Sequence, residues 1–307
     1  MPAAYAHMTL VNELSEPRVL ESISGFSDKL IPAVLDYFKF CELGSVSPDL
    51  PYLALGDSDA AIWADKMHYE NTCSMIAVGA RNIQDLSGTD RDKAVAWLLG
   101  YAAHVAMDVT IHPVVELKVG PYHGNETDHR LCEMNQDAYI FPRLNLGDIG
   151  LSEHLDSGIG KCTNVSGDFD PVILRLWDAI FQEVHQGEYH DNTPDINKWF
   201  KGFVRVVDNI AEEGNRLLPL ARHVAAGAAL VYPLEDEVDE TFIRGLRTPR
   251  GSMGYDAVFD LAKSNVGNLW ASISEAILQA DNAQLVSLGE WNLDTGRDQN
   301  DSLVYWS

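Results

Sequence analysis

The sequence predicts an all-α fold in a single large multi-helix domain. Apolar residues recur at three- and four-residue gaps over most of the chain, and strand alternation is scarce. No internal repeat or convincing linker divides the chain, and 307 residues with 46% apolar content can build one large core. We therefore expect one domain over 1–307, with the candidate metal ligands in 1–140 and helical completion plus a tail in 141–307.

Helical periodicity marks the expected helices in order, at 17–39, 59–83, 90–111, 129–140, 170–186, 194–226 and 254–282. Asp90 and Asp170 suit N-cap or first-turn positions, and Pro171 suits a first helical position. Pro219 is expected to bend the sixth helix. The helix at 90–111 should be central and buried, because its metal-binding face and its apolar residues occupy different stripes.

The remaining segments are expected to be irregular. VSPDLPYLAL contains two prolines that would break a helix, so it is interpreted as an extended loop. The stretch 143–169 is rich in Gly, Asp and Ser, and 232–253 carries an acidic run typical of a solvated face. The tail, 284–307, shows no clear element.

The charge and the cysteines limit the function classes. Forty-six acidic against 22 basic residues give a net charge of −24, and three Zn²⁺ ions would return only six charges. Such a surface repels nucleic-acid phosphates, so no stable nucleic-acid complex is expected, although a small phosphodiester could still enter a metal-lined pocket. The four scattered cysteines form no CxxC pair and are expected to be free thiols.

The chain shows no signal for export or membrane insertion. MPAAYAHMTLVNEL lacks the basic start and apolar run of a signal peptide. No 18 uninterrupted apolar residues occur, so no transmembrane segment is expected. The expected location is cytoplasmic, and the sequence leaves the oligomeric state open.

The most informative feature is a fourfold spacing of potential metal ligands. His104, Asp108 and His112 recur every fourth residue, and His129 and Glu133 repeat that spacing. A gap of four places two side chains on one helix face, about 5–6 Å apart at Cβ. His104 and His112 lie roughly 12 Å apart along a helix, too far to share one ion. Asp108 is therefore a candidate bridge in a multinuclear site.

Three further candidates lie upstream: His7, Asp49 and His68. Taken singly, each has an ordinary explanation as a core, surface or turn residue. Their order with the later ligands makes a site the better interpretation: His7, Asp49, His68, His104, Asp108, His112, His129 and Glu133.

In this ordered set the chain resembles the zinc-dependent phospholipase C family, whose fold and metal core are shared with the S1/P1 nucleases. The resemblance covers about residues 1–140, through HxxxD, a further His and then HxxxE; the spacings between segments differ from the secreted enzymes. It implies a cluster of two or three Zn²⁺ ions. The first ion would be held by Asp49, His68, His104 and Asp108, and the second by His112, His129 and Glu133.

The resemblance implies a third ion, held by His7, the shared Asp108 and the N-terminal residue. Secreted relatives expose an N-terminal Trp by signal cleavage, whereas this chain begins Met-Pro. Removal of the initiator Met would place the Pro2 amine at the terminus, with His7 as the sixth residue. Pro2 is therefore the expected terminal ligand.

Imidazole and carboxylate ligands suit Zn²⁺, which activates water and can clamp a phosphoryl group. The predicted function is a zinc-dependent phosphoric ester hydrolase acting on a small-molecule or lipid phosphoester. Asp49 is the candidate that orients or deprotonates the attacking water, as its family counterpart is thought to do. His123, near the motif in GPYHGNETDH, is the candidate substrate contact.

Three alternatives stay open. The same chemistry could serve an S1/P1-type nuclease or nucleotidase, although no basic, aromatic-interleaved stripe is present. The site could be structural, although structural zinc sites are usually closed and rich in cysteine. The scaffold could also carry non-hydrolytic chemistry with zinc or a di-iron centre, although di-iron proteins typically use ExxH motifs.

Overall fold

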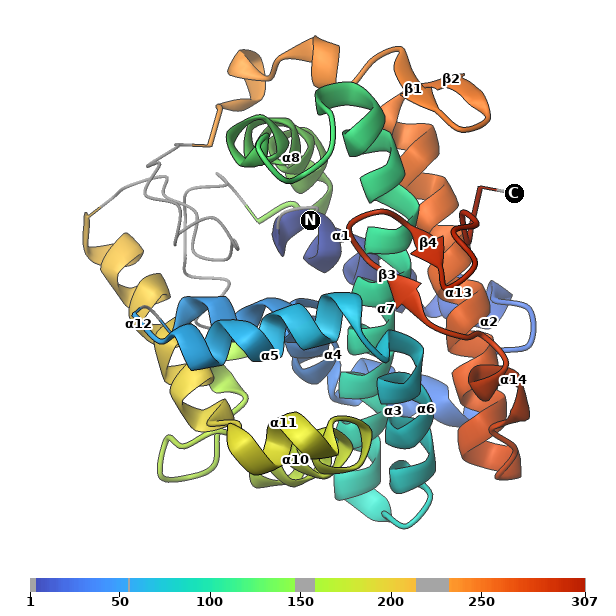
Figure 1. The fold of residues 1–307 in the computed structure, drawn as a ribbon. Helices are drawn as coiled ribbons and strands as arrows, with labels where there is room; N and C mark the ends of the chain where they lie inside the picture. The colour runs from blue at the N-terminus through green and yellow to red at the C-terminus, as the bar shows by residue number, and fades with distance from the viewer. Residues whose placement is uncertain (1–3, 55, 147–157, 214–231, 307) are drawn as a thin grey trace.

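The computed structural model describes residues 4–54, 56–146, 158–213 and 232–306 (Figure 1). These residues form a helical protein in which the only strands of the described ranges are two short antiparallel hairpins. The all-α prediction is confirmed. The α-helices are α1 Ala4–Ser15, α2 Pro17–Ser22, α3 Ile31–Asp36, α4 Phe38–Val46, α5 Ser58–Tyr69, α6 Thr72–Ile83, α7 Gly88–Val119, α8 Glu126–Ile140, α10 Pro171–Val184, α11 Gln186–Asp191, α12 Ile196–Glu213, α13 Tyr255–Gln279 and α14 Ala283–Val286.

The shorter elements lie between these helices and after them. The 3-10 helices are η1 Asp28–Leu30, η2 Ser47–Leu53, η3 Phe141–Leu144, η4 Ile159–Lys161, η6 Glu235–Glu237 and η7 Glu240–Phe242. The first hairpin pairs β1 Leu246–Thr248 with β2 Gly251–Met253, in the register Arg247 to Ser252. The second pairs β3 Trp291–Asn292 with β4 Arg297–Asp298.

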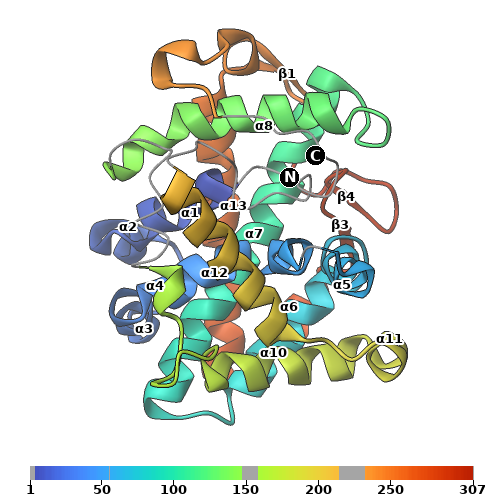
Figure 2. The same ribbon diagram turned by 90° about the vertical axis from the view of Figure 1, so that its left-hand side faces the viewer.

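Helix α7 is the central element, as predicted for 90–111. Figures 1 and 2 show it running through the middle of the molecule, and α4, α13, α6, α1 and α8 pack on it. Every residue from Ala94 to Val115 is buried. By length and composition α7 could cross a membrane, but its most apolar 18-residue window lies wholly inside the protein, as in a core helix.

Two glycines allow α4 and α7 to touch along their backbones. A Cβ added to Gly100 would lie 2.0 Å from the Cys41 carbonyl oxygen, and one added to Gly44 would lie 2.1 Å from the Trp97 carbonyl oxygen. No real Cβ tolerates such distances, so only glycine permits this approach. The close contact sets α4, and the residues that follow it, against the face of α7 that carries His104.

Two long predicted helices are divided in the structure. The segment 17–39 becomes α2, η1 and α3, and α4 begins at Phe38. The segment 59–83 becomes α5 and α6, separated at Asn71, which adopts a left-handed φ of 56°. Helix α1 lies before any predicted segment. Periodicity found the apolar faces here but not the breaks between helices.

The expectation of an extended loop over VSPDLPYLAL is wrong for Ser47–Leu53, which forms η2. Pro48 stands in the first turn, where a missing N–H removes no helical hydrogen bond. The short 3-10 helix then accommodates Pro51. Asp49 therefore lies in a helical turn, with 2% of its surface exposed.

The later elements follow the predicted order. Asp170 caps α10 by accepting from the Val172 and Ile173 amides, and Pro171 begins that helix, as expected. Helix α12 matches the start of 194–226, whereas Pro219 lies outside the described residues. The segment 232–253 contains η6, η7 and the first hairpin, and the tail contains α14 and the second hairpin. All four cysteines are free and buried, which confirms that prediction.

Candidate metal centre

Helix α7 presents three buried polar side chains on one face. His104 and Asp108 are fully buried and His112 is 2% exposed. The fourfold spacing brings neighbours together, because Nε2 of His104 lies 3.3 Å from Oδ2 of Asp108. A buried carboxylate between two imidazoles is expensive unless charge or a ligand compensates it.

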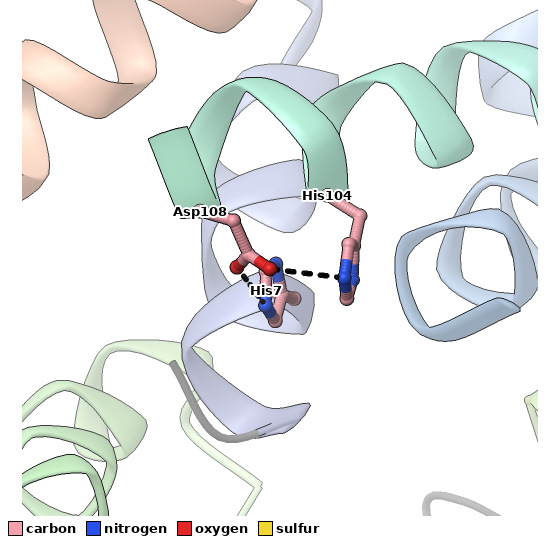
Figure 3. Close-up of side chains that lie close together, drawn as sticks. All are labelled: His7, His104 and Asp108. Atoms are coloured by element: carbon pink, nitrogen blue, oxygen red, sulfur yellow. Dashed lines mark ion pairs between the residues drawn. The ribbon is translucent and has the colours of Figure 1, made fainter. Parts of the chain in front are cut away.

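Helix α1 adds His7 to this face. Its ring stacks on that of His104 with centroids 4.1 Å apart, and its Nε2 lies 3.2 Å from Oδ1 of Asp108. Figure 3 shows the three side chains converging from α1 and α7. The two oxygens of Asp108 thus face two different histidines. This is the arrangement expected of a carboxylate that bridges two ions.

A second triplet forms around the same His104. Asp49 from η2 and His68 from the end of α5 place Oδ1 and Nε2 3.6 Å apart. Nε2 of His68 lies 3.4 Å from Nε2 of His104. The ligand atoms of Asp49, His68 and His104 all lie within 4.8 Å of one another, and so do those of His7, His104 and Asp108.

Main-chain carbonyls fix which nitrogen of each ring faces the centre. Nδ1 of His68 donates to the Ala64 carbonyl at 2.7 Å, and Nδ1 of His104 donates to the Ser45 carbonyl at 2.9 Å. In the neutral rings, therefore, both Nε2 atoms carry a lone pair and no proton. Two lone pairs facing each other at 3.4 Å, beside a carboxylate, fit a bound cation.

Several buried atoms of the cluster lack a hydrogen-bonding partner among the described residues. They are both nitrogens of His7, both oxygens of Asp108 and Nε2 of His112. The contacts of Asp108 with His7 and His104 are ion-pair distances in which no N–H is aligned to donate. Buried polar atoms of native proteins are normally satisfied. The imidazole and carboxylate donors left open here match the preferences of Zn²⁺.

The remaining predicted ligands lie on α7 and α8. Nδ1 of His112 donates to the Leu293 carbonyl at 2.6 Å, which leaves Nε2 for a metal. His129 has the opposite orientation, because its Nε2 contacts the Gly120 carbonyl at 2.7 Å and its Nδ1 lies 3.9 Å from Oε1 of Glu133. His112, His129 and Glu133 do not form a triplet with ligand atoms within 4.8 Å, so their common ion stays a prediction.

The electrostatics favour the metal-binding state of three ligands, whereas Asp108 and Asp49 outweigh burial and raise the pKa of His104, which must lose its proton when a metal binds. Burial, with a smaller contribution from nearby His104, lowers the pKa of His7 to about 4. Burial likewise lowers the pKa of His112 to about 4. Burial alone would raise the pKa of Asp108, but His104 and His112 hold it well below its usual range. His7 and His112 are therefore neutral and Asp108 is ionised, the states that metal ligands require.

The structure does not bring His123 to the cluster, and Pro2 lies outside the described residues. His123 has a fully exposed side chain, with Nδ1 4.0 Å from Oε1 of Glu126. A role in binding substrate therefore stays a prediction for His123.

Sequence reasoning missed Asp137, a fully buried carboxylate of α8. It accepts from the Tyr5 and Ala6 amides at 3.1 and 2.8 Å and from the Tyr232 hydroxyl at 2.8 Å. It thereby caps α1 from a distant helix and holds the turn that carries His7. The signal was present, since Asp137 continues the fourfold spacing of His129 and Glu133.

Comparison with known proteins agrees with this geometry. The family model described as zinc dependent phospholipase C matches residues 6–187, which include all eight predicted side-chain ligands. No curated protein and no solved structure matches the chain. The match spans more than half of the 307 residues. The chain therefore belongs to the zinc dependent phospholipase C family, and is a zinc-dependent phosphoesterase by that membership.

Proposed function

We propose that this protein hydrolyses phosphodiester bonds in the manner of a phospholipase C, with a cluster of two or three zinc ions. The observation that carries the proposal is the pair of imidazoles whose Nε2 atoms face each other at 3.4 Å beside Asp49 and Asp108. A structural zinc site is usually closed by cysteines, whereas every cysteine here is free. A cluster of imidazoles and carboxylates favours catalysis.

The contacts support a division of the ligands between sites. Asp49, His68 and His104 would hold one ion, with Oδ2 of Asp108 completing the set. Oδ1 of Asp108 and His7 would hold a second ion, with Pro2 as the proposed terminal ligand. One Nε2 lone pair binds only one ion, so Asp108, and not His104, would bridge the two ions. His112, His129 and Glu133 would hold the other ion.

Bound zinc supplies a polarised phosphoryl oxygen and lowers the pKa of water toward about 7. Asp49 would orient that water and accept its proton, because it is the one carboxylate of the triplet with His68 and His104. Asp49 is 2% exposed, so its carboxylate is shielded from bulk water. His7 and His104, stacked and held from two helices, keep Asp108 in place.

The proposed substrate is a lipid or small-molecule phosphodiester. Family membership supports a lipid phosphoester. The net charge of −24 opposes the approach of a polynucleotide, because proteins bind nucleic acids largely by neutralising their phosphates with Lys and Arg side chains. A single small phosphodiester meets less of this repulsion, because zinc offsets the charge locally.

Metal analysis followed by activity assays tests the proposal. Purified protein should hold two or three equivalents of zinc, hydrolyse bis(p-nitrophenyl) phosphate and release diacylglycerol from phosphatidylcholine. Chelation should abolish these activities, and added zinc should restore them. Preferential cleavage of single-stranded DNA would reassign the protein as a nuclease. If the zinc-loaded protein hydrolyses no phosphoester, the proposed activity is wrong.

A further inference from the structure

A C-terminal segment of the chain contacts the metal centre, although this segment lies outside residues 6–187, which match the family model. Strands β3 and β4 are joined by residues 293–296, called here the C-terminal turn. The turn is closed by the Gly296 amide, which donates to the Asn292 carbonyl at 2.9 Å, and by the Thr295 amide, which donates to the Asn292 side chain at 3.1 Å.

One side of the C-terminal turn is seated on α7. Pro113 has no N–H, so the Val109 carbonyl lacks the helical donor that the fourth residue after it would supply. Gly296 packs at this point: a Cβ added to it would lie 2.4 Å from Cγ of Pro113 and 2.5 Å from the Val109 oxygen. Gly296 also has a φ of +65°. Both the contact and the backbone conformation require glycine there.

The other side of the C-terminal turn contacts two predicted ligands. The Leu293 carbonyl accepts from Nδ1 of His112 at 2.6 Å, and the Leu293 amide donates to the His68 carbonyl at 2.9 Å. The next residue, Asp294, accepts from the Tyr69 hydroxyl at 2.7 Å. Leu293 is fully buried, so water does not compete for these hydrogen bonds. The C-terminal turn thus joins the end of α5 to the turn of α7 that carries His112.

We propose that the C-terminal turn is a positioning element for the metal centre, which holds His112 as the Nδ1–H tautomer and aims its Nε2 at the ion. Nε2 is the nitrogen of His112 that is buried without a hydrogen-bonding partner. A carbonyl behind a ligating imidazole fixes its tautomer and ring orientation, and losing such a partner typically weakens metal binding about 10- to 100-fold. The proposal rests on the zinc cluster of the proposed function, and its tests measure tautomer and metal binding, not hydrolysis.

The first test measures the wild-type protein and uses a substitution only to assign the signals of His112. Zinc-free protein with ¹⁵N-labelled histidine should show His112, assigned by the loss of its signals in His112→Asn, as a single Nδ1–H tautomer with a protected proton. Zinc should then shift the Nε2 resonance and leave the Nδ1 proton bonded. A His112 ring that is protonated at Nε2, or that exchanges between tautomers, would overturn the proposal.

The second test displaces the C-terminal turn. Gly296→Ala forces it away from Pro113 and Val109 and should weaken the binding of one zinc equivalent about 10- to 100-fold, with loss of the single tautomer. The matched control is Gly167→Ala, at a φ of +81° with no atom within 4 Å of the added Cβ, which should bind zinc as the wild type does. Tyr69→Phe removes only the hydroxyl bonded to Asp294 and should give a smaller loss in the same direction.

The outcomes separate this inference from the proposed function. If the wild-type protein binds no zinc, the proposed function and the inference are both wrong. A wild type that binds zinc, beside a folded Gly296→Ala variant with an unchanged isotherm and tautomer, removes only the inference. If Gly296→Ala does not fold, the tautomer of the wild type and the isotherm of Tyr69→Phe decide.

Discussion

Replacing Asp108 with Asn tests the bridge at the centre of the cluster. Oδ1 and Oδ2 of Asp108 lie 3.2 and 3.3 Å from Nε2 of His7 and of His104, and the side chain is fully buried. Asn keeps the shape but has one oxygen, and its NH₂ cannot ligate a metal. One of the two sites then loses its ligand oxygen, and the other keeps a neutral oxygen in place of a charged one. Asp108→Asn should therefore release more than one zinc equivalent.

The magnitude follows from linkage between zinc binding and folding. At free zinc 100-fold above Kd, each bound ion stabilises the folded state by about 2.7 kcal/mol. Losing an outer hydrogen-bonding partner weakens metal binding about 10- to 100-fold, and a direct ligand matters at least as much. A 100-fold weaker Kd leaves about 0.4 kcal/mol per ion, so two ions lose about 4–5 kcal/mol. For 307 residues, with an unfolding entropy of about 2.1 cal/mol/K per residue, this lowers Tm by about 7 °C.

Zinc content by elemental analysis and melting curves at buffered free zinc measure both effects. Asp170→Asn is the control, because Asp170 is also buried and Asn can replace it as the cap of α10. The control should keep its zinc. A chelator should reduce the difference in Tm between Asp108→Asn and the wild type. An Asp108→Asn protein with full zinc and an unchanged Tm would refute the bridging role.

Three further substitutions probe the chemistry, a buried histidine and the helix packing. Asp49→Asn should lower kcat on a phosphodiester by roughly 10²–10⁴; full zinc with lost turnover supports the base role, lost zinc supports only ligation, and retained turnover with full zinc removes Asp49 from the mechanism. Burial lowers the pKa of His185 in the folded protein to about 4. Because His185 of the unfolded chain binds a proton already near pH 6.5, the free energy of unfolding falls as the pH drops from about 6.5 to 4. In chelator, denaturant titrations of His185→Gln should show a shallower fall, and an equal slope would contradict this. Gly100→Ala should destabilise by about 1–3 kcal/mol or more through overpacking against Cys41, whereas Gly267→Ala, with only ordinary contacts, should be neutral or stabilising; similar melting of the two variants would contradict the close packing.

Much of the helical arrangement was predictable because its signals are local. The fourfold spacing in α7 and α8 gave both the helices and the pairing of neighbouring ligands, and the structure places His104 and Asp108 as that spacing requires. The order of His7, Asp49 and His68 indicated the family, but no local rule places them at His104. Three separate elements do so, namely α1, η2 and α5.

What the sequence did not reveal depends on distant contacts. Helix α1 has no acidic residue in its first turn, and Asp137 accepts instead from the Tyr5 and Ala6 amides, 132 and 131 residues away in sequence. The C-terminal turn is flanked by strands of two residues, too short for an alternating pattern. Its position is set by the fit of Gly296 to Pro113, which no periodicity expresses.

Four of the five histidines predicted as ligands share one feature that couples the metal site to the whole fold. Each contacts a main-chain carbonyl through one ring nitrogen and leaves the other nitrogen for a metal: His68 to Ala64, His104 to Ser45, His112 to Leu293 and His129 to Gly120. A main-chain carbonyl cannot change without moving its element. Packing therefore sets the direction of the lone pair on the free ring nitrogen of each histidine, so the affinity for metal should depend on helix packing. On this argument Gly100→Ala, which no substrate or metal contacts, should weaken zinc binding through the Ser45 carbonyl as well as lower stability. A Gly100→Ala protein that is destabilised but binds zinc as the wild type does would show that the centre forms independently of the contact between α4 and α7.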